Sequence, residues 1–416
     1  MTLAGTLTTH SNWKWTKAKD VIDIRDGTHD SPKYQASGIP LVTSKNLVDG
    51  KIDFSTCSYI SEKDHIEISK RSAVDDGDIL YAMIGTIGNP VIVEKNFEFS
   101  IKNVALFKFN NAEVYNRYFY HLLSSDIVSR QFKKNTRGGT QKFVSLGNMR
   151  NIDIPLPPLA EQKRIAAILD KADALRRKRE KAIALIDDLL RSVFLDMFGD
   201  PVTNPKGWRV ERLNNLSTKI RSGTTPVGGS KVYVEKGVVF LRSQNVWRKK
   251  LELDDVVYLD EATHRKMNNT SLKNGDILIT KTGRINTENS SLGRASIFLG
   301  EDDSANINGH VYLIRLKPEV INEFVLYIIT TKEYRDYIRS VCVGGIDKRQ
   351  INKDHLEQFP IIDPPVEAQQ QFIERLQVIE KQKLALNKQL RLANNMFFSL
   401  FQRAFRGELT TQKDAA

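Results

Sequence analysis

The stretch Ile154–Asp200 reads IPLPPLAEQKRIAAILDKADALRRKREKAIALIDDLLRSVFLDMFGD. Pro157 and Pro158 lack the backbone N–H groups that a helix or strand would use, so they end whatever element comes before them. Neither Gly nor Pro occurs again until Gly199. The stretch therefore predicts a single helix of about forty residues, which at about 1.5 Å per residue is about 60 Å long.

One face of this predicted helix is apolar. Apolar or small residues recur at alternating spacings of three and four, which is the pattern of a helix that buries one seam against a partner. These residues are Ile168, Ala172, Leu175, Ala182, Ile186, Leu189 and Val193, and Arg179 interrupts the seam.

A second stretch repeats this design. Ile361–Arg406 reads IIDPPVEAQQQFIERLQVIEKQKLALNKQLRLANNMFFSLFQRAFR and again begins with a double proline. Its seam comprises Phe372, Leu376, Ile379, Leu386, Leu390, Ala393, Phe397 and Leu400. Two matched stripes can cover each other, whereas an isolated one would stay exposed, so we predict a coiled-coil pair formed by distant parts of the chain. Plain core packing of each helix is the alternative.

Composition indicates a soluble globular protein with a polyanionic partner. The chain has 416 residues, of which 40% are hydrophobic and 27% charged, and no apolar run is long enough to span a membrane. The start has no signal-peptide pattern and the two cysteines are far apart, so we expect a cytoplasmic protein without a disulfide framework. The 62 basic residues outnumber the 50 acidic ones, for a net charge of +12, which favours nucleic acid as the partner.

The segments before the two helices look like copies of one domain. Shared landmarks are Gly-Thr at Gly27 and Gly223, the related nonapeptides GIPLVTSKN from Gly38 and GVVFLRSQN from Gly237, G-D-I-L from Gly77 and Gly275, and Gly-Gly turns at Gly138 and Gly344. A repeat of this length indicates duplication of a whole domain with its helix. The predicted domains are 1–155, 156–200 (first helix and linker start), 201–362 and 363–416 (second helix and tail).

Each copy has the pattern of a mixed α+β domain. Short apolar runs bounded by Gly, Asn or Asp predict strands, and one helix is expected near the end of each copy. The predicted strands are 40–43, 79–83, 91–94 and 104–109 in the first copy and 238–242, 277–281, 295–299 and 311–316 in the second; the predicted helices are 115–132 and 320–341. Residues 198–207, FGDPVTNPKG, are predicted to be a linker because they contain two prolines and two glycines.

Motifs of catalysis and metal binding are absent from the sequence. There is no phosphate-binding loop, no H-E-x-x-H and no G-x-S-x-G, and the seven histidines show no metal-ligand spacing. Asp363-Pro364-Pro365-Val366 resembles the acidic-Pro-Pro-aromatic signature of amino methyltransferases, but Val366 stands where the aromatic ring should be. A helix-start signal explains this tetrapeptide better than catalysis does.

Polar loops at equivalent places in the two copies are the candidates for binding. Glycines let a backbone approach phosphate closely, cations beside them add grip, and Arg, Asn and Gln are the residue types that read base edges. The candidate DNA-binding residues are Thr28, Lys45, Asn46, Thr86, Lys134, Arg137 and Lys142 in the first copy, and Thr224, Arg242, Gln244, Lys281, Arg284, Lys348 and Arg349 in the second. For any one of them, ordinary solvated loop polarity is the alternative.

This layout resembles the specificity subunit of type I restriction-modification systems. The resemblance covers nearly the whole chain and is carried by the duplication, by P-P-h-x-x-Q at Pro157–Gln162 and more loosely at Pro364–Gln369, by M-F-G-D-P from Met197 and by F-R-G-E-L from Phe405. It implies two α+β target-recognition domains separated by an antiparallel pair of long coiled-coil helices, related by a pseudo-two-fold.

The resemblance also implies a function. Each domain would recognise one half of a bipartite, asymmetric site on double-stranded DNA, and the helices would set the gap between the halves. The chain itself would have no catalytic activity and no cofactor. It would hold two adenine-N6 methyltransferase subunits that use S-adenosylmethionine, and the assembly can recruit endonuclease subunits that translocate with ATP and Mg²⁺.

Other functions remain alternatives on the sequence alone. The chain could serve a methylation-only system or a related defence system, since the partners are encoded elsewhere. A stand-alone nuclease or methyltransferase would be active as the purified chain with Mg²⁺ or S-adenosylmethionine. A coiled-coil scaffold that binds only protein would not bind DNA even with its partners present.

Overall fold

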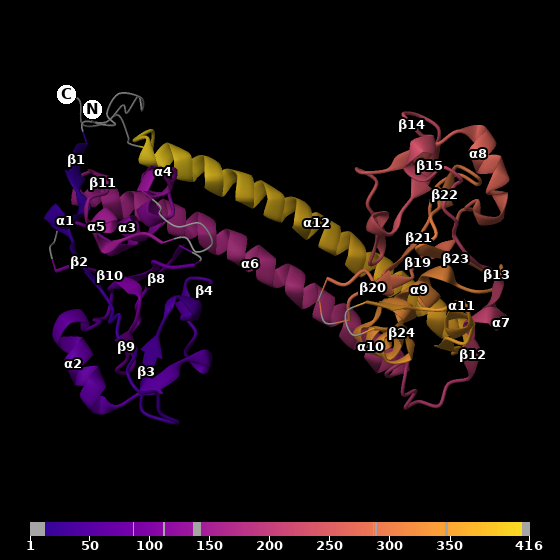
Figure 1. The fold of residues 1–416 in the computed structure, drawn as a ribbon, viewed down its shortest axis with the longest axis horizontal. Helices are drawn as coiled ribbons and strands as arrows, with labels where there is room; N and C mark the ends of the chain where they lie inside the picture. The colour runs from indigo at the N-terminus through magenta and orange to yellow at the C-terminus, as the bar shows by residue number, and fades with distance from the viewer. Residues whose placement is uncertain are drawn as a thin grey trace. The chain divides into compact units, whose positions relative to one another are not determined.

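The computed structural model describes residues 13–85, 87–110, 113–135, 143–285, 287, 289–345 and 348–409 (Figure 1). It divides into two compact units, of which unit 1 comprises Met1–Lys181 with Asn387–Ala416 and unit 2 comprises Ala182–Leu386. The two predicted long helices are α6 (Leu159–Phe198) and α12 (Val366–Phe405), and both are confirmed. Each unit therefore contains one copy of the repeated domain and a part of each long helix.

Unit 1 contains a mixed α+β domain before α6. Its strands are β1 (Lys14–Lys17), β2 (Asp23–Asp26), β3 (Ile39–Val42), β4 (Leu47–Val48), β5 (Lys51–Ile52), β6 (Ser58–Ile60), β7 (Ile79–Ala82), β8 (Gly88–Ile92), β9 (Ser100–Ile101), β10 (Val104–Lys108) and β11 (Asp153–Leu156). Its helices are α1 (Ala18–Val21), α2 (Glu62–Ser72), α3 (Asn116–Leu123), α4 (Asp126–Asn135) and α5 (Leu146–Arg150). One sheet has the order β2-β10-β7-β8 and another the order β6-β3-β9, and β1 pairs with β11, which joins the two ends of the domain.

Unit 2 repeats this order of elements. Its strands are β12 (Val210–Arg212), β13 (Ser217–Ser222), β14 (Tyr233–Val234), β15 (Val238–Leu241), β16 (Val246–Trp247), β17 (Lys250–Leu251), β18 (Val257–Leu259), β19 (Ile277–Thr280), β20 (Thr282–Gly283), β21 (Ala295–Ile297), β22 (Ala305–Ile307), β23 (Val311–Leu316), β24 (Val343–Gly344), β25 (Arg349–Gln350) and β26 (Pro360–Ile362). Its helices are α7 (Leu213–Leu216), α8 (Glu261–Lys266), α9 (Asn322–Thr330), α10 (Lys332–Val341) and α11 (Lys353–Glu357). The sheet β13-β23-β19-β21 corresponds to β2-β10-β7-β8, and β18-β15-β22, to which β14 is added, corresponds to β6-β3-β9, so the predicted duplication of an α+β domain is confirmed.

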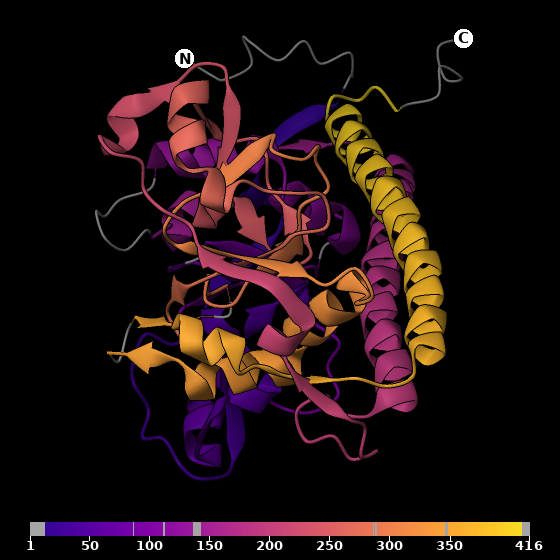
Figure 2. The same ribbon diagram turned by 90° about the vertical axis from the view of Figure 1, so that its right-hand side faces the viewer.

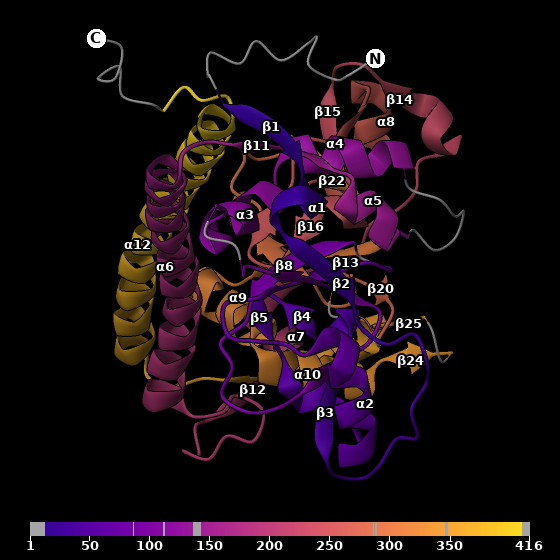
Figure 3. The ribbon, with the colours of Figure 1, turned by 90° about the vertical axis from the view of Figure 1, so that its left-hand side faces the viewer.

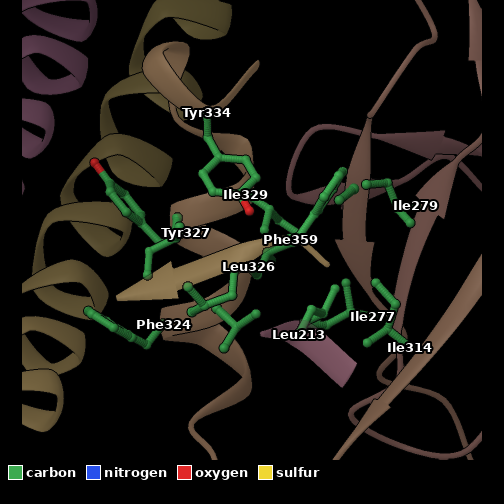
Figure 4. Close-up of a cluster of buried hydrophobic side chains, with 14 of the residues drawn as sticks. Leu213, Ile277, Ile279, Ile314, Phe324, Leu326, Tyr327, Ile329, Tyr334 and Phe359 are labelled. Carbon is green, nitrogen blue, oxygen red and sulfur yellow. The ribbon is translucent and has the colours of Figure 1, made fainter. Parts of the chain in front are cut away.

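The ends of the long helices belong to the domain cores. In unit 2, Phe194 and Phe198 of α6 and Phe372 of α12 pack with Phe324 and Tyr327 of α9, with ring centroids 4.8 to 6.3 Å apart. Figure 4 shows Phe324 and Tyr327 on one side of the core of unit 2 and the sheet residues Ile277 and Ile314 on the other, with Phe359 between them. Burial of these rings anchors the helix ends to the domain.

The helices run antiparallel within each unit. In unit 1, Ile165 and Leu169 near the start of α6 share a core with Ala404 and Phe405 at the end of α12. In unit 2 the end of α6 shares a core with the start of α12, and Lys383 of α12 pairs with Asp187 of α6. Figures 2 and 3 show the two helices side by side.

The predicted seam of α6 is partly wrong. Leu175 and Leu189 are 38% and 50% exposed. The fully buried positions of α6 instead include Ile165, Leu169 and Phe194, because the ends of the helix pack against a domain as well as against α12. The spacing identified the helix but not the face that the domains cover.

Each predicted terminal helix is interrupted. In unit 1 the break between α3 and α4 falls at Ser124–Ser125, and in unit 2 the break between α9 and α10 falls at Thr331. The Thr331 hydroxyl accepts a hydrogen bond from the Tyr334 backbone N–H at 3.2 Å, so it caps a new helix. Short hydroxyl side chains inside a helical pattern supply such caps.

The predicted linker at residues 198–207 is an ordered loop. The Trp208 indole donates to the Phe198 carbonyl at 2.9 Å, and the Asp200 carboxylate accepts from the Val202 backbone at 2.7 Å. Gly199 and Gly207 have φ of +77° and +68°, which glycine adopts without strain. The prolines and glycines therefore shape a turn and do not form a flexible tether.

Two strand predictions need correction. β8 begins at Gly88, earlier than predicted, and β20 directly follows the predicted strand 277–281 and was not predicted. β20 pairs with β25, which lies far along the chain, so local sequence could not predict it.

Candidate nucleic-acid interface

A short 3₁₀ turn follows the strand at the landmark nonapeptide of each domain. In unit 1 it spans Ser44–Asn46, and the Asn46 amide accepts from the Thr43 backbone at 2.9 Å and donates to the Asp53 carbonyl and the Thr56 hydroxyl. Asn46 is only 3% exposed. Its hydrogen-bonding capacity is therefore used inside the turn, and the prediction that it contacts DNA is corrected to a structural role.

Lys45 at the same turn remains available to a ligand. It is exposed and lines a polar cavity of about 380 Å³ together with Asn89 and Pro90 at β8, Tyr120 of α3 and Arg177 of α6. Arg177 donates to the Asp49 carbonyl at 3.0 Å and to the Asp173 carboxylate at 2.6 Å, which places a second cation beside the loop of Lys45.

The equivalent turn of unit 2, Ser243–Asn245, has the same frame and different side chains. Asn245 caps it as Asn46 does, accepting from the Arg242 backbone at 2.9 Å and donating to the carbonyls of Glu252 and Asp255. Arg242 is half-buried and pairs with the Asp255 carboxylate at 3.2 Å. Gln244 is exposed and donates to the same carboxylate.

The Gly-Thr landmarks place Thr28 and Thr224 where the backbone packs closely against another segment of the same domain. A Cβ on Gly27 would lie 2.3 Å from the Ile101 carbonyl oxygen, and one on Gly223 would lie 2.2 Å from that of Asn308, so only glycine fits. Thr28 is half-buried and bonded through its backbone to Ile101, whereas Thr224 is exposed.

His29 follows Thr28 and was not singled out from the sequence. Its ring lies 2.8 Å from Asn103 Oδ1 and 2.9 Å from the buried Asp26 carboxylate, which also pairs with Arg71. The hydrogen bond to Asn103 is the largest cause, followed by that to Asp26, of a pKa of His29 above its ordinary value. A raised pKa favours the charged form of His29, which follows Thr28 in the chain.

Lys281 of unit 2 directly follows β19. Its ammonium donates to the Ser222 hydroxyl at 3.0 Å and lies 4.7 Å from the centre of the Tyr312 ring. Desolvation lowers the pKa of Lys281. Its backbone N–H donates to the His310 carbonyl at 2.9 Å, so Lys281 is held next to the turn that also contacts Gly223.

A small three-stranded sheet brings together the remaining candidates of unit 2. β25 pairs with β20 on one side and β24 on the other, with Gly283 opposite Arg349. Arg284 and Lys348 are exposed, and Arg349 is half-buried. Figure 3 shows β24 and β25 at the periphery of unit 2. The structure therefore groups Lys281, Arg284, Lys348 and Arg349 around the three-stranded sheet β20-β25-β24.

The remaining candidates of unit 1 follow α4 or lie outside the described part of the chain. Lys134 lies near the end of α4, and Thr86, Arg137 and Lys142 lie outside the described residues.

Trp247 is a further residue that sequence reasoning missed. It is 38% exposed on β16, and the Arg294 guanidinium lies 3.7 Å from the centre of its ring. Its indole donates to the Gln244 carbonyl at 3.0 Å. Nothing local in the sequence signals this stack, because Arg294 comes from a loop that closes only in the folded domain.

The described residues offer no metal site and no membrane span. No cluster of three or more His, Cys, Asp or Glu in these parts of the chain could hold a metal ion. Among the same residues, none of the helices is both long and apolar enough to cross a bilayer.

The two domains match one protein family. The model of the family described as "Type I restriction modification DNA specificity domain" matches residues 10–185 and 205–393. The chain belongs to this family. The suspected specificity subunit of a type I restriction-modification system is therefore confirmed.

Relatives of similar length support this assignment. The specificity subunit of the type I restriction enzyme EcoBI from Escherichia coli is 25% identical, over 98% of this chain and 88% of its own. That of MjaVIII from Methanocaldococcus jannaschii is 26% identical over 84% of each chain. A crystal structure of a type I restriction-modification S subunit from M. genitalium has the same fold, with a TM-score of 0.56, 14% identity and coverage of 97% of this chain and 98% of that one.

Proposed function

We propose that the chain is the recognition subunit of a type I restriction-modification complex in which each domain reads one half of a bipartite, asymmetric DNA site. The observation that carries this proposal is the difference between equivalent edges of one fold. At the same turn, unit 1 presents Lys45 and unit 2 presents Gln244 beside Arg242. Recognition of two different half-sites requires different polar side chains, and here they stand on the same backbone turn.

The helices have a second role in this proposal. α6 and α12 each contribute to both units, so they connect the domains and set the gap between the half-sites. They also hold two adenine-N6 methyltransferase subunits, which use S-adenosylmethionine. The chain itself is non-catalytic, and endonuclease subunits that use ATP and Mg²⁺ join the assembly.

Exchange of one domain tests the proposal. Residues 13–155 are replaced by the corresponding domain of another family member, and the methylated sites are identified by sequencing DNA modified by the assembled complex. We expect one half of the recognised site to change and the other half to stay as it is. A change in both halves would contradict independent recognition by the two domains.

Binding of DNA should also depend strongly on salt. With a net charge of +12, part of the affinity comes from release of counterions from phosphates, so the logarithm of the binding constant should fall linearly with that of the salt concentration. A scaffold that binds only protein would show no such DNA binding, even with its partners present.

A further inference from the structure

We propose that Gln244 reads one base pair by accepting a hydrogen bond from an exocyclic amino group, and that Asp255 is the positioning residue that orients it. This inference rests on the proposed function and specifies the chemistry of one contact within the second half-site.

The backbone at Gln244 is held in place. The 3₁₀ turn is capped by Asn245, and the Gln244 carbonyl accepts a hydrogen bond from the Trp247 indole at 3.0 Å. Trp247 is itself fixed by the Arg294 guanidinium, 3.7 Å from the centre of its ring. The exposed Gln244 side chain therefore extends from a backbone with little freedom, which lowers the entropy lost on binding.

Asp255 is equally well placed. Its carbonyl accepts from Arg242 Nη2 at 2.8 Å and from Asn245 Nδ2 at 2.9 Å, which fixes its backbone against the turn. Its carboxylate then takes hydrogen bonds from Arg242 at 3.2 Å and from Gln244 Nε2. Because the guanidinium offsets the carboxylate charge, Asp255 can lie near DNA without strong repulsion from phosphates.

This arrangement decides which atom Gln244 presents. A carboxylate accepts hydrogen bonds only, so the amide must turn its NH₂ group toward Asp255, and the opposite orientation would set two acceptors against each other. No described residue donates to Gln244 Oε1, so the side chain presents an acceptor to a ligand. In the major groove only adenine N6 and cytosine N4 donate, which makes an amino-bearing base the expected partner.

The described part of unit 1 has no glutamine oriented by a carboxylate at the equivalent turn. Thr56 occupies the place of Asp255, where its hydroxyl accepts from Asn46 at 3.1 Å, and Val48 occupies the place of Trp247. Lys45 stands where Gln244 does, and its cation suits a phosphate more than a base edge. The two turns therefore share a frame but differ in the kind of contact that they offer.

Three variants test the inference in the complex with its methyltransferase subunits. Asp255→Ala removes the positioning carboxylate, and Gln244→Leu removes the acceptor. Glu252→Ala is the matched control, because Glu252 is an acid of the same loop whose side chain pairs with Lys250 and not with Gln244. The methylated motif is read from sequenced DNA for each variant, and the thermal unfolding midpoint checks the fold.

We expect Asp255→Ala and Gln244→Leu to relax the same single position of the second half-site. Discrimination in favour of an amino-bearing base at that position should fall about tenfold, the scale of one base contact. Glu252→Ala should keep the wild-type motif, and all three variants should keep the first half-site.

Two outcomes would overturn the inference. One is an unchanged motif in Gln244→Leu, whose exposed side chain can be removed without loss of the fold. The other is relaxation of the same position by Glu252→Ala, which would indicate a general charge effect. If the wild-type complex recognised no bipartite site at all, the proposed function itself would fail, so the two failures are distinguishable.

Discussion

Arg315 donates two hydrogen bonds of 2.8 Å to the carboxylate of Asp276, which is only 1% exposed. The same carboxylate accepts from the Lys273 backbone at 2.7 Å. In unit 1, Lys108 makes the equivalent ion pair with Asp78 at 2.8 Å. The Asp of each G-D-I-L landmark is thus a buried anion that ties the start of one strand to a neighbouring strand of the same sheet.

Removal of the cation from this pair should destabilise unit 2. Arg315→Met leaves Asp276 buried and without its charge partner, so we expect the free energy of unfolding to fall by about 3–5 kcal/mol. Urea denaturation measures this change. The matched control is Lys250→Met, which breaks the exposed, solvent-screened Lys250–Glu252 pair and should cost far less. Equal losses in the two variants would contradict a special role for the buried pair.

An acidic group on α6 should make unit 1 sensitive to low pH. Asp170 accepts from Arg117 at 2.6 Å and from His121 at 2.9 Å. Burial raises the pKa of Asp170, but the hydrogen bonds from His121 and Arg117 outweigh it and lower the pKa from 3.8 to about 2. A lowered folded-state pKa stabilises the protein above the unfolded value, and this contribution disappears as the pH falls from about 4 toward about 2.

Asp170→Asn tests this linkage. The variant should lose about 1 kcal/mol of stability at neutral pH, allowing for solvent screening of the partly exposed group. Its free energy of unfolding should then decline less than that of the wild type below about pH 4. Asp126→Asn is the control, because Asp126 and Arg130 are 3.6 Å apart and largely exposed. A wild-type curve parallel to that of Asp170→Asn would refute the prediction.

Gln162 connects the start of α6 to the domain before it. The side chain is fully buried, and it accepts from the Tyr115 backbone at 2.8 Å and donates to the carbonyls of Glu113 and Pro157 at 2.7 and 2.9 Å. Gln162→Leu keeps the size but loses these bonds, so we expect a loss of about 3 kcal/mol. Hydrogen exchange should show earlier opening of the first turn of α6.

The corresponding glutamine of α12 provides a comparison. Gln369 is 8% exposed and donates to the Pro364 carbonyl at 2.8 Å and to Asp363 at 3.3 Å. Gln369→Leu should therefore cost less than Gln162→Leu. An exposed position such as Lys163→Leu should leave hydrogen exchange unchanged, and if Gln162→Leu behaved in the same way the connecting role would be excluded.

The sequence was sufficient for the long helices because their signals are local. Pro157 and Pro158 precede α6 and Gly199 follows it, and the same reasoning applies to α12. The repeat of landmark motifs then predicted two copies of one domain. The break at Thr331 was missed because a hydroxyl residue is compatible with both a helix interior and a cap until the next backbone N–H is placed.

The candidate site was harder to predict because its contacts are not local. Asn46 is of a residue type that can contact base edges, yet in the folded protein its amide points inward and caps a turn. Asp255 lies eleven residues after Gln244 and carries no motif, but it determines which atom of Gln244 is presented. The residue types thus predicted which loops carry polar side chains. Only the fold shows which amides are used in hydrogen bonds within the protein and which are free to contact a ligand.

Lengthening both long helices should change the spacing of the recognised half-sites. A seven-residue insertion keeps the seam in register, so matched insertions after Ala184 in α6 and after Leu386 in α12 should extend the pair by about 10 Å. With a rise of about 3.4 Å per base pair, we expect a gap about three base pairs longer and unchanged half-site sequences. Sequencing of methylated DNA measures both quantities. The same seven residues inserted between Gly228 and Gly229, in the turn that precedes β14 and outside both long helices, should leave the gap as it is. An unaltered gap after the helix insertions would show that something other than α6 and α12 sets the distance.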